Sequence, residues 1–157
     1  MTEYGVDTDA WRPLPWSWAA ERLARSRNLW VVTASTSGRP QALPVWGVWS
    51  DDGPGFGFSC APGARKAANI AANPQVCVMA DDTVECVSVE GRAAVVEGDR
   101  KDLWVGRYLA KYAPIAPTLT ADFIRDNAVI ELVPERAFGI IEREDEFAAR
   151  ATRWRFA

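Results

Sequence analysis

The chain has 157 residues, a formal net charge of −3 and no histidine. This length fits one domain, and a composition of 48% hydrophobic and 25% charged residues is typical of a globular protein. The acidic balance argues against a nucleic-acid partner, which needs a basic surface, and no apolar run reaches the roughly 18 residues of a membrane span.

The first half of the chain predicts a helix followed by a strand meander. Residues 1–14 are expected to form an N-terminal arm, and 15–157 a single domain. Apolar residues at helical spacing predict a helix over 15–27, and Pro15 suits its first position. Three β-rich runs separated by turn residues then predict strands, at 29–35, 41–50 and 56–60.

The second half adds short helices between further strands. A helix over 64–72 ends before Pro74, because the residue before a proline disfavours helical geometry. The other predicted helices cover 99–112 and 120–125, the second with Thr120 as its N-cap. The remaining strands are expected at 75–80, 84–96, 128–133, 137–142 and 152–156. Many strands with few short helices predict a mainly β fold, a closed antiparallel barrel.

The absence of histidine excludes whole classes of catalyst. Ser-His-Asp and Cys-His nucleophiles are ruled out, and so are histidine-dependent zinc and iron sites. Cys60, Cys77 and Cys86 are odd in number and lack CxxC spacing, so we interpret them as buried thiols and expect no metal site. The chemistry is therefore expected to come from a bound cofactor. The N-terminus lacks a signal-peptide pattern, which favours the cytoplasm.

The segment from Ser59 to Lys66 is the candidate binding motif. A strand ends there, a Pro-Gly loop follows, and a helix begins with Arg65 and Lys66 in its first turn. Cations at a helix N-terminus oppose the helix dipole, whereas free backbone N–H groups at the same place attract an anion. A phosphate would reconcile the two effects. The alternative is that both side chains simply point into water.

The chain resembles a known superfamily in Gly38-Arg-Pro-Gln-Ala-Leu-Pro-Val-Trp46, Phe58-Ser59 and Ala64-Arg-Lys-Ala-Ala-Asn69. With this spacing it is similar to the pyridoxamine 5′-phosphate oxidase-like, FMN-binding split barrels over about residues 17–157. The closest branch is that of the actinobacterial flavin- or deazaflavin (coenzyme F-420)-dependent oxidoreductases. The resemblance implies a split barrel, FMN-binding-protein-like, that forms a homodimer with shared cofactor pockets.

The resemblance also implies which residues hold the cofactor. The ring would lie against the strand from Gln41 to Trp46, with main-chain groups of Leu43 and Val45 at the pyrimidine edge. Ser59 and Cys60 would line the approach to the phosphate, Arg65 and Lys66 would bind it, and Asn69 would orient Lys66. The second subunit would complete the pocket. The full implied set is Gln41, Leu43, Pro44, Val45, Trp46, Ser59, Cys60, Arg65, Lys66, Asn69, Glu85, Cys86, Val87, Arg153 and Trp154.

Three positions depart from the oxidase pattern. Gln41 and Trp46 stand where the oxidase carries basic residues, and Ala64 stands where it has a serine, which argues against a true pyridoxamine phosphate oxidase. Trp46 could face a bulky ring or pack in the barrel, and Trp30 and Trp49 are expected in the core. The helix over 99–112 could overhang the pocket mouth.

The function implied is an oxidoreductase that transfers a hydride from a reduced deazaflavin or flavin to a small conjugated acceptor, with no catalytic protein residue assigned. An FMN-dependent oxidoreductase is an alternative. A non-catalytic module that stores a flavin, a deazaflavin or haem is another, although haem would need Cys, Tyr or Met as its ligand. The last alternative is a purely structural barrel whose ancestral cofactor pocket no longer binds a ligand.

Overall fold

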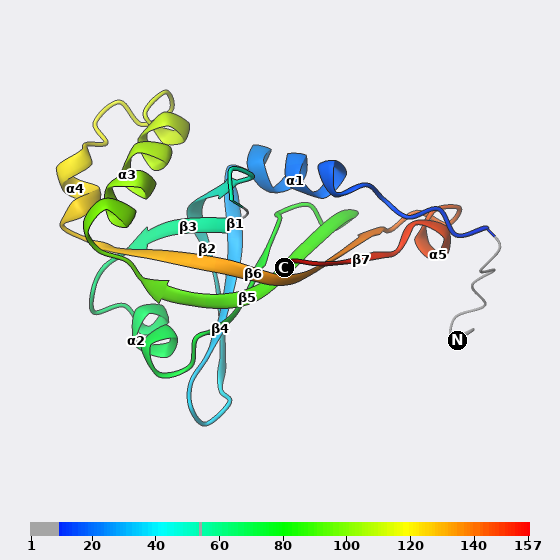
Figure 1. The fold of residues 1–157 in the computed structure, drawn as a ribbon, viewed down its shortest axis with the longest axis horizontal. Helices are drawn as coiled ribbons and strands as arrows, with labels where there is room; N and C mark the ends of the chain where they lie inside the picture. The colour runs from blue at the N-terminus through cyan, green and yellow to red at the C-terminus, as the bar shows by residue number, and fades with distance from the viewer. Residues whose placement is uncertain (1–9, 54) are drawn as a thin grey trace.

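The fold is an antiparallel barrel with short helices around it (Figure 1). The computed structural model describes residues 10–53 and 55–157. The strands are β1 (Asn28–Ala34), β2 (Pro40–Ser50), β3 (Gly55–Cys60), β4 (Gln75–Met79), β5 (Glu85–Val95), β6 (Ala128–Ile141) and β7 (Thr152–Arg155). The helices are α1 (Trp16–Arg25), α2 (Arg65–Ala72), α3 (Gly98–Tyr112), α4 (Ala121–Arg125) and α5 (Phe147–Arg150).

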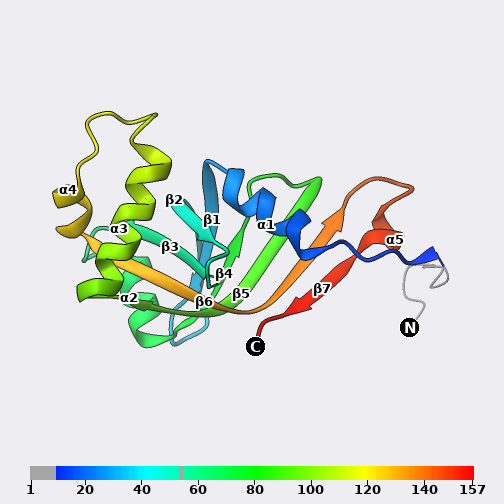
Figure 2. The same cartoon turned by 45° about the horizontal axis from the view of Figure 1, so that its top comes forward.

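Six strands close the barrel. They are hydrogen-bonded in the order β3-β2-β1-β4-β5-β6, and an additional pairing of β3 with β6 completes the circle. Among the described residues, β7 pairs only with the far half of β6, so the β6–β7 hairpin extends away from α3 and α4 (Figure 2). The mainly β split-barrel prediction is confirmed.

Two apolar clusters hold the fold together. Inward-facing residues of the strands, such as Leu29, Val78 and Phe58, fill the barrel. A second cluster lies outside it, where Trp104 and Tyr112 of α3 pack with Val129 of β6. A Cβ added at Gly57 would come within 2.3 Å of the Trp104 ring, so only glycine lets α3 approach β3 this closely.

The barrel is split between β2 and β3. The two strands pair only from Gly47 to Ser50 of β2 and from Gly55 to Phe58 of β3. Beyond Phe58, β3 continues along β6, whereas residues 40–46 of β2 continue along β1. One edge of β2 is therefore not paired with β3 over residues 40–46.

Three sequence expectations needed correction. The two strands predicted at 128–133 and 137–142 are one, because Glu135 forms a bulge in β6 between the pairs Glu90–Arg136 and Gly91–Pro134, so no break is needed. The short helix α5 was not predicted. Trp30 is 42% exposed on the outer face of β1, while Trp49 is buried as expected.

The N-terminal arm is described only in part. Residues 1–9 of the predicted arm lie outside the described residues. Trp11 Nε1 donates a hydrogen bond of 2.9 Å to the Ala151 carbonyl, so the chain enters the fold beside α5 and β7. In the ranges 10–53 and 55–157, no helix combines the length and apolar character needed to cross a membrane.

Candidate functional site

The start of α2 carries two cations without an acidic partner. Arg65 is exposed and Lys66 is half-buried, and neither makes an ion pair within the described residues. Ala64 at the N-cap has no side-chain acceptor, and the first turn contains no acidic residue. The positive end of the helix dipole and both side chains are thus uncompensated, which favours an anion at this position.

Asn69 anchors α2 to the barrel. Its Nδ2 donates a hydrogen bond of 2.9 Å to Thr33 Oγ1 on β1, and both side chains are buried. This bond holds Asn69 toward the barrel interior. The predicted orientation of Lys66 by Asn69 has no such bond to support it.

Gln41 lies beside this anchor with an unused acceptor. It pairs with Thr33 across β1 and β2, which places both side chains on the same face. Gln41 Oε1 is buried and has no hydrogen-bond partner in the chain. A buried acceptor without a partner is costly, and a donor group of a ligand would satisfy it.

Residues 40–46 of β2 form the edge that is paired with β1 but not with β3. Proline has no N–H, so Pro44 is most compatible with a position whose main chain faces away from β1. By alternation, the main chains of Leu43 and Val45 face β1, and those of Ala42 and Trp46 face the open edge. A ring at this edge would therefore meet the main-chain groups of Ala42, Pro44 and Trp46 more readily than those predicted, of Leu43 and Val45.

The ring of Trp46 is already in contact with α3. It stacks on Tyr112 with 4.7 Å between ring centroids and 7° between the ring planes. One face of the indole is thus used for packing.

The end of α3 is fixed to the same strand. Tyr112 Oη accepts a hydrogen bond of 2.7 Å from Gly47 N, and Lys111 Nζ donates to the carbonyls of Ser26 and Gly47 at 2.7 and 2.8 Å. Burial lowers the pKa of Lys111 to about 8 and raises that of Tyr112 to about 12. Tyr108 is also buried, so this face of α3 packs on the barrel.

Ser59 and Cys60 stand at the split and lead into α2. They pair with Val129 and Ala128 of β6, and both are partly buried. Burial raises the pKa of the Cys60 thiol, and the charge of Lys66 acts in the opposite direction. Cys60 is therefore a neutral thiol near neutral pH. On the far side of the loop, Pro62 and Gly63 line a cavity of about 420 Å³ that reaches Lys101 of α3.

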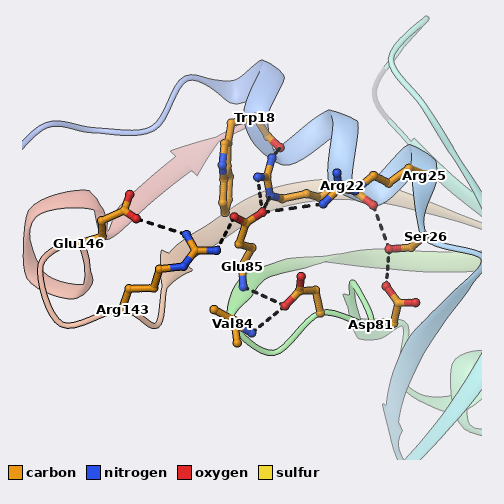
Figure 3. A network of polar contacts seen from close by, with 10 residues as sticks. Trp18, Arg22, Arg25, Ser26, Asp81, Val84, Glu85, Arg143 and Glu146 are labelled. Atoms are coloured by element: carbon orange, nitrogen blue, oxygen red, sulfur yellow. Dashed lines mark hydrogen bonds and ion pairs between the residues drawn. The ribbon is translucent and has the colours of Figure 1, made fainter.

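Glu85 is held by arginines of its own chain (Figure 3). Arg22 Nε of α1 and Arg143 Nη2 each donate to its carboxylate at 2.9 Å, and Arg25 lies 3.8 Å away. These bonds, with that from Arg143 the largest contribution, lower the pKa of Glu85. The carboxylate joins α1, β5 and the segment after β6, which gives it a structural role.

The Glu85 neighbours lie beside β7. Cys86 and Val87 pair with Ile140 and Gly139, and Gly139 also pairs with Thr152 of β7. The Val87 side chain is fully buried in the barrel, while Cys86 is partly buried.

Arg153 and Trp154 belong to the same end of the molecule. Arg153 is exposed opposite Phe138, whereas Trp154 points inward and packs on Trp16 at a centroid distance of 5.4 Å. Along β6, the partners of Ser59 and Arg153 are nine positions apart, which corresponds to roughly 30 Å of strand. The structure thus brings the implied residues together as two separate groups.

The first group surrounds the split and the start of α2, and consists of Gln41, Leu43, Pro44, Val45, Trp46, Ser59, Cys60, Arg65, Lys66 and Asn69. The second group lies at the β7 end and consists of Glu85, Cys86, Val87, Arg153 and Trp154. One chain cannot place both groups on one small molecule. Sequence reasoning missed Thr33, which holds Asn69, because a threonine within a strand carries no signal of that role.

Comparisons with solved structures agree on the fold. The haem storage protein HutZ from Vibrio cholerae is 21% identical, with a TM-score of 0.63, over 78% of this chain and 94% of that one. A haem-binding protein from Mycobacterium smegmatis is 19% identical, with a TM-score of 0.66, over 90% and 59%. A protein described as an F420 reductase is 23% identical, with a TM-score of 0.58, over 74% and 93%.

No curated protein matches the chain. The family model described as pyridoxamine 5′-phosphate oxidase matches residues 18–140, which include β1 to β5, all of β6 except its last residue, and the whole of the first group. The chain therefore belongs to the pyridoxamine 5′-phosphate oxidase family.

Proposed function

We propose that the chain binds a phosphorylated flavin or deazaflavin at the split between β2 and β3 and uses it as an oxidoreductase. The observation that carries this proposal is the convergence of three features: the edge of β2 that is not paired with β3, the end of β3 at Ser59 and Cys60, and the uncompensated cations of α2. An apolar strand edge beside an anion site suits a ring with a phosphate arm.

The residues around the split fit a phosphorylated flavin or deazaflavin. Arg65, Lys66 and the first N–H groups of α2 would hold the phosphate through charge-assisted hydrogen bonds. Gln41 offers its unpartnered buried oxygen to a donor of the ring. The main-chain groups of the β2 edge are the remaining candidates for the ring's polar rim.

A homodimer would complete the site. The β7 group is remote from the split within one chain, so Arg153 and its neighbours could reach a ligand at α2 only from a second copy. The outer face of β1 and β4 supports a subunit contact, since it presents Trp30 and Met79 side by side. Exposed aromatic residues in such a patch are typical of interfaces.

When bound, the cofactor would supply hydride transfer to a small conjugated acceptor, and the protein would supply orientation and a dry surface. Tyr112 is unsuited to donate a proton, because its hydroxyl is engaged with Gly47 and its pKa is raised. The balancing proton would come from water. The cytosolic location expected from the sequence remains a prediction.

Haem storage is the second candidate, favoured by the similarity of the fold to a haem storage protein and a haem-binding protein. With no histidine, a ligand would have to be Cys, Tyr or Met. Burial raises the pKa of Cys60, Cys77 and Cys86, which disfavours thiolate ligation. The residues present therefore support a flavin-type cofactor better.

The test starts with the purified chain. Titration with FMN, with coenzyme F-420 and with haemin, followed by fluorescence and absorbance, identifies the cofactor. The chain loaded with the reduced cofactor is then mixed anaerobically with a quinone, and cofactor reoxidation is measured. We expect tight binding of FMN or coenzyme F-420 and reoxidation with the quinone. Tight binding without turnover would support storage, and binding of haemin alone would overturn the proposal.

A further inference from the structure

The outer face of the β6–β7 hairpin carries a groove separate from the split. Its cavity of about 480 Å³ is lined by Ser88, Glu90, Arg136, Ala137, Phe138, Arg153, Trp154 and Arg155. The strand registers arrange the outward-facing residues in two rows. Ser88, Phe138 and Arg153 form one row, and Glu90, Arg136 and Arg155 form the next.

Positive charge is concentrated in these rows. Arg136 lies directly opposite Arg155, and Arg153 is two residues away on the same strand face. Like charges directly opposite each other destabilise a sheet. Glu90 pairs with Arg136 and is the one acidic side chain that lines the groove. Within the described residues, Arg153 and Arg155 have neither an ion pair nor a side-chain hydrogen bond.

The groove also contains an aromatic ring, that of Phe138, and Trp154 beneath it packs on the barrel core. The Arg153 guanidinium lies 5.9 Å from the centre of the Phe138 ring. Below them, Trp154 packs edge-to-face on Trp16, which fixes β7 on the barrel core. An aromatic ring flanked by guanidinium groups suits a ligand with a flat body and an acidic group.

We propose that this groove is an anion-binding site for a small molecule, with Arg153 and Arg155 holding a phosphate or carboxylate and Phe138 contacting the apolar part. The cavity has the size of a small-molecule site. The ligand would relieve the repulsion between Arg136 and Arg155. The groove shares Arg153 and Trp154 with the residues implied for the cofactor, whereas Arg136, Arg155 and Phe138 lie outside that set, and binding of a free anion to the groove does not require that a cofactor binds at the split.

The anionic group could come from two sources. It could belong to an acidic arm of a cofactor held at α2 of a second copy, or to a separate anionic substrate. Both present the same chemistry to the groove. Competition with the cofactor distinguishes them.

The test uses inorganic pyrophosphate as the probe and the full chain, with binding measured by calorimetry and thermal unfolding. We expect pyrophosphate to bind the wild type and raise its Tm. In Arg153→Gln/Arg155→Gln, the affinity should fall by at least about tenfold, since each arginine supplies a charge-assisted hydrogen bond. Without pyrophosphate this variant should be at least as stable as the wild type, because two like charges are removed.

Arg107→Gln/Arg125→Gln is the matched control, since it removes two positive charges from α3 and α4 and should keep the wild-type affinity. Equal affinity in the groove variant, or no binding to the wild type, would overturn the proposal. So would a change in oligomeric state in the groove variant, which would assign the arginines to a subunit contact. Saturation with FMN or coenzyme F-420 removes the part of pyrophosphate binding that depends on Arg153 and Arg155 if the cofactor arm fills the groove, and leaves that part unchanged if a separate substrate does.

This design separates the two proposals. If neither FMN nor coenzyme F-420 binds, the cofactor proposal fails, while binding of pyrophosphate that depends on Arg153 and Arg155 still supports the groove. If the cofactor binds and pyrophosphate does not, only the groove proposal fails.

Discussion

Asn69 of α2 donates a buried hydrogen bond of 2.9 Å to Thr33 of β1, a residue 36 positions earlier in the chain. This contact fixes the helix whose first turn carries Arg65 and Lys66. The position of the proposed phosphate site therefore depends on a polar contact inside the barrel rim.

Replacing this amide should loosen α2. Asn69→Ala leaves the buried Thr33 hydroxyl without its donor, which is expected to lower the free energy of unfolding by about 1–3 kcal/mol. Cofactor affinity should fall as well, because the cations lose their fixed position. Urea unfolding and cofactor titration measure the two effects. Asn127→Ala is the control, since its amide bond to the Phe123 carbonyl is exposed; an equal loss in both variants would contradict the anchoring role of Asn69.

The hydroxyl of Tyr112 should matter more than that of Tyr108. Tyr112 Oη accepts from Gly47 N and lies within hydrogen-bond distance of the Arg27 and Gly47 carbonyls. Tyr112→Phe should cost about 1–3 kcal/mol, because a buried N–H loses its partner. The Tyr108 ring is also buried, but its hydroxyl makes no hydrogen bond to any residue in 10–53 or 55–157, so Tyr108→Phe should cost less than about 1 kcal/mol. Chemical denaturation compares the two, and the reverse order would refute this account of the α3 anchor.

Lys111 predicts a distinctive alkaline dependence of stability. Its pKa falls from 10.5 to about 8 on folding because of burial. Between these pH values the unfolded chain binds the proton and the folded chain does not, so this residue makes stability rise with pH. Cys77, whose pKa is raised from 9.0 to about 11, has the opposite effect in an overlapping range.

Lys111→Met isolates the lysine. The unfolding free energy of the wild type minus that of the variant should increase between about pH 8 and pH 10.5, whatever the difference at neutral pH. Lys101→Met, which removes a partly buried lysine 3.4 Å from Glu97, is the control for loss of a lysine charge, and the slope of Lys111→Met is measured against it. A flat difference for Lys111→Met would rule out a depressed pKa.

Glu85 should hold the hairpin segment to α1. Its pKa is lowered on folding, so its contribution is complete above its unfolded pKa and is lost as the pH falls through the folded value. Glu85→Gln should remove about 1–3 kcal/mol of stability at neutral pH, since the arginine contacts lose their charged partner.

Hydrogen exchange locates this effect. Amides of 143–156 should exchange faster in Glu85→Gln, because Arg143 is released together with Arg22 (Figure 3). Glu144→Gln, an exposed neighbour, should leave the exchange rates unchanged. Protection that stays the same in both variants would show that β7 is held by other contacts alone.

Most of the fold could be predicted because local signals agreed with it. Alternating apolar residues marked the strands, Pro74 marked the end of α2, and Thr120 does accept a hydrogen bond from Phe123 N as its N-cap role predicts. The continuity of β6 through Pro134 could not be predicted, since it depends on a bulge at Glu135 of β6 that forms only against β5 in the sheet. Helix α5 is a single short turn with little periodicity of its own.

The candidate site was predictable only in part. The cations at the start of α2 stood out by charge and position, and the family motif supplied the β2 edge. The stacking of Trp46 on Tyr112 and the arginine contacts of Glu85 are long-range pairings that no spacing reveals. The arginine rows of the β6–β7 hairpin were missed, because only the register places Arg136 opposite Arg155.

The central claim is that Arg65 and Lys66 bind the phosphate of a flavin-type cofactor. Arg65→Ala/Lys66→Ala should weaken the binding of FMN or coenzyme F-420, whichever binds the wild type, by about 3–6 kcal/mol, or more than about a hundredfold, at about 1.5–3 kcal/mol for each charged hydrogen bond. Thermal unfolding should show that the variant remains folded, and Arg107→Gln/Arg125→Gln should bind as the wild type does. Wild-type affinity in the folded Arg65→Ala/Lys66→Ala protein would contradict the claim.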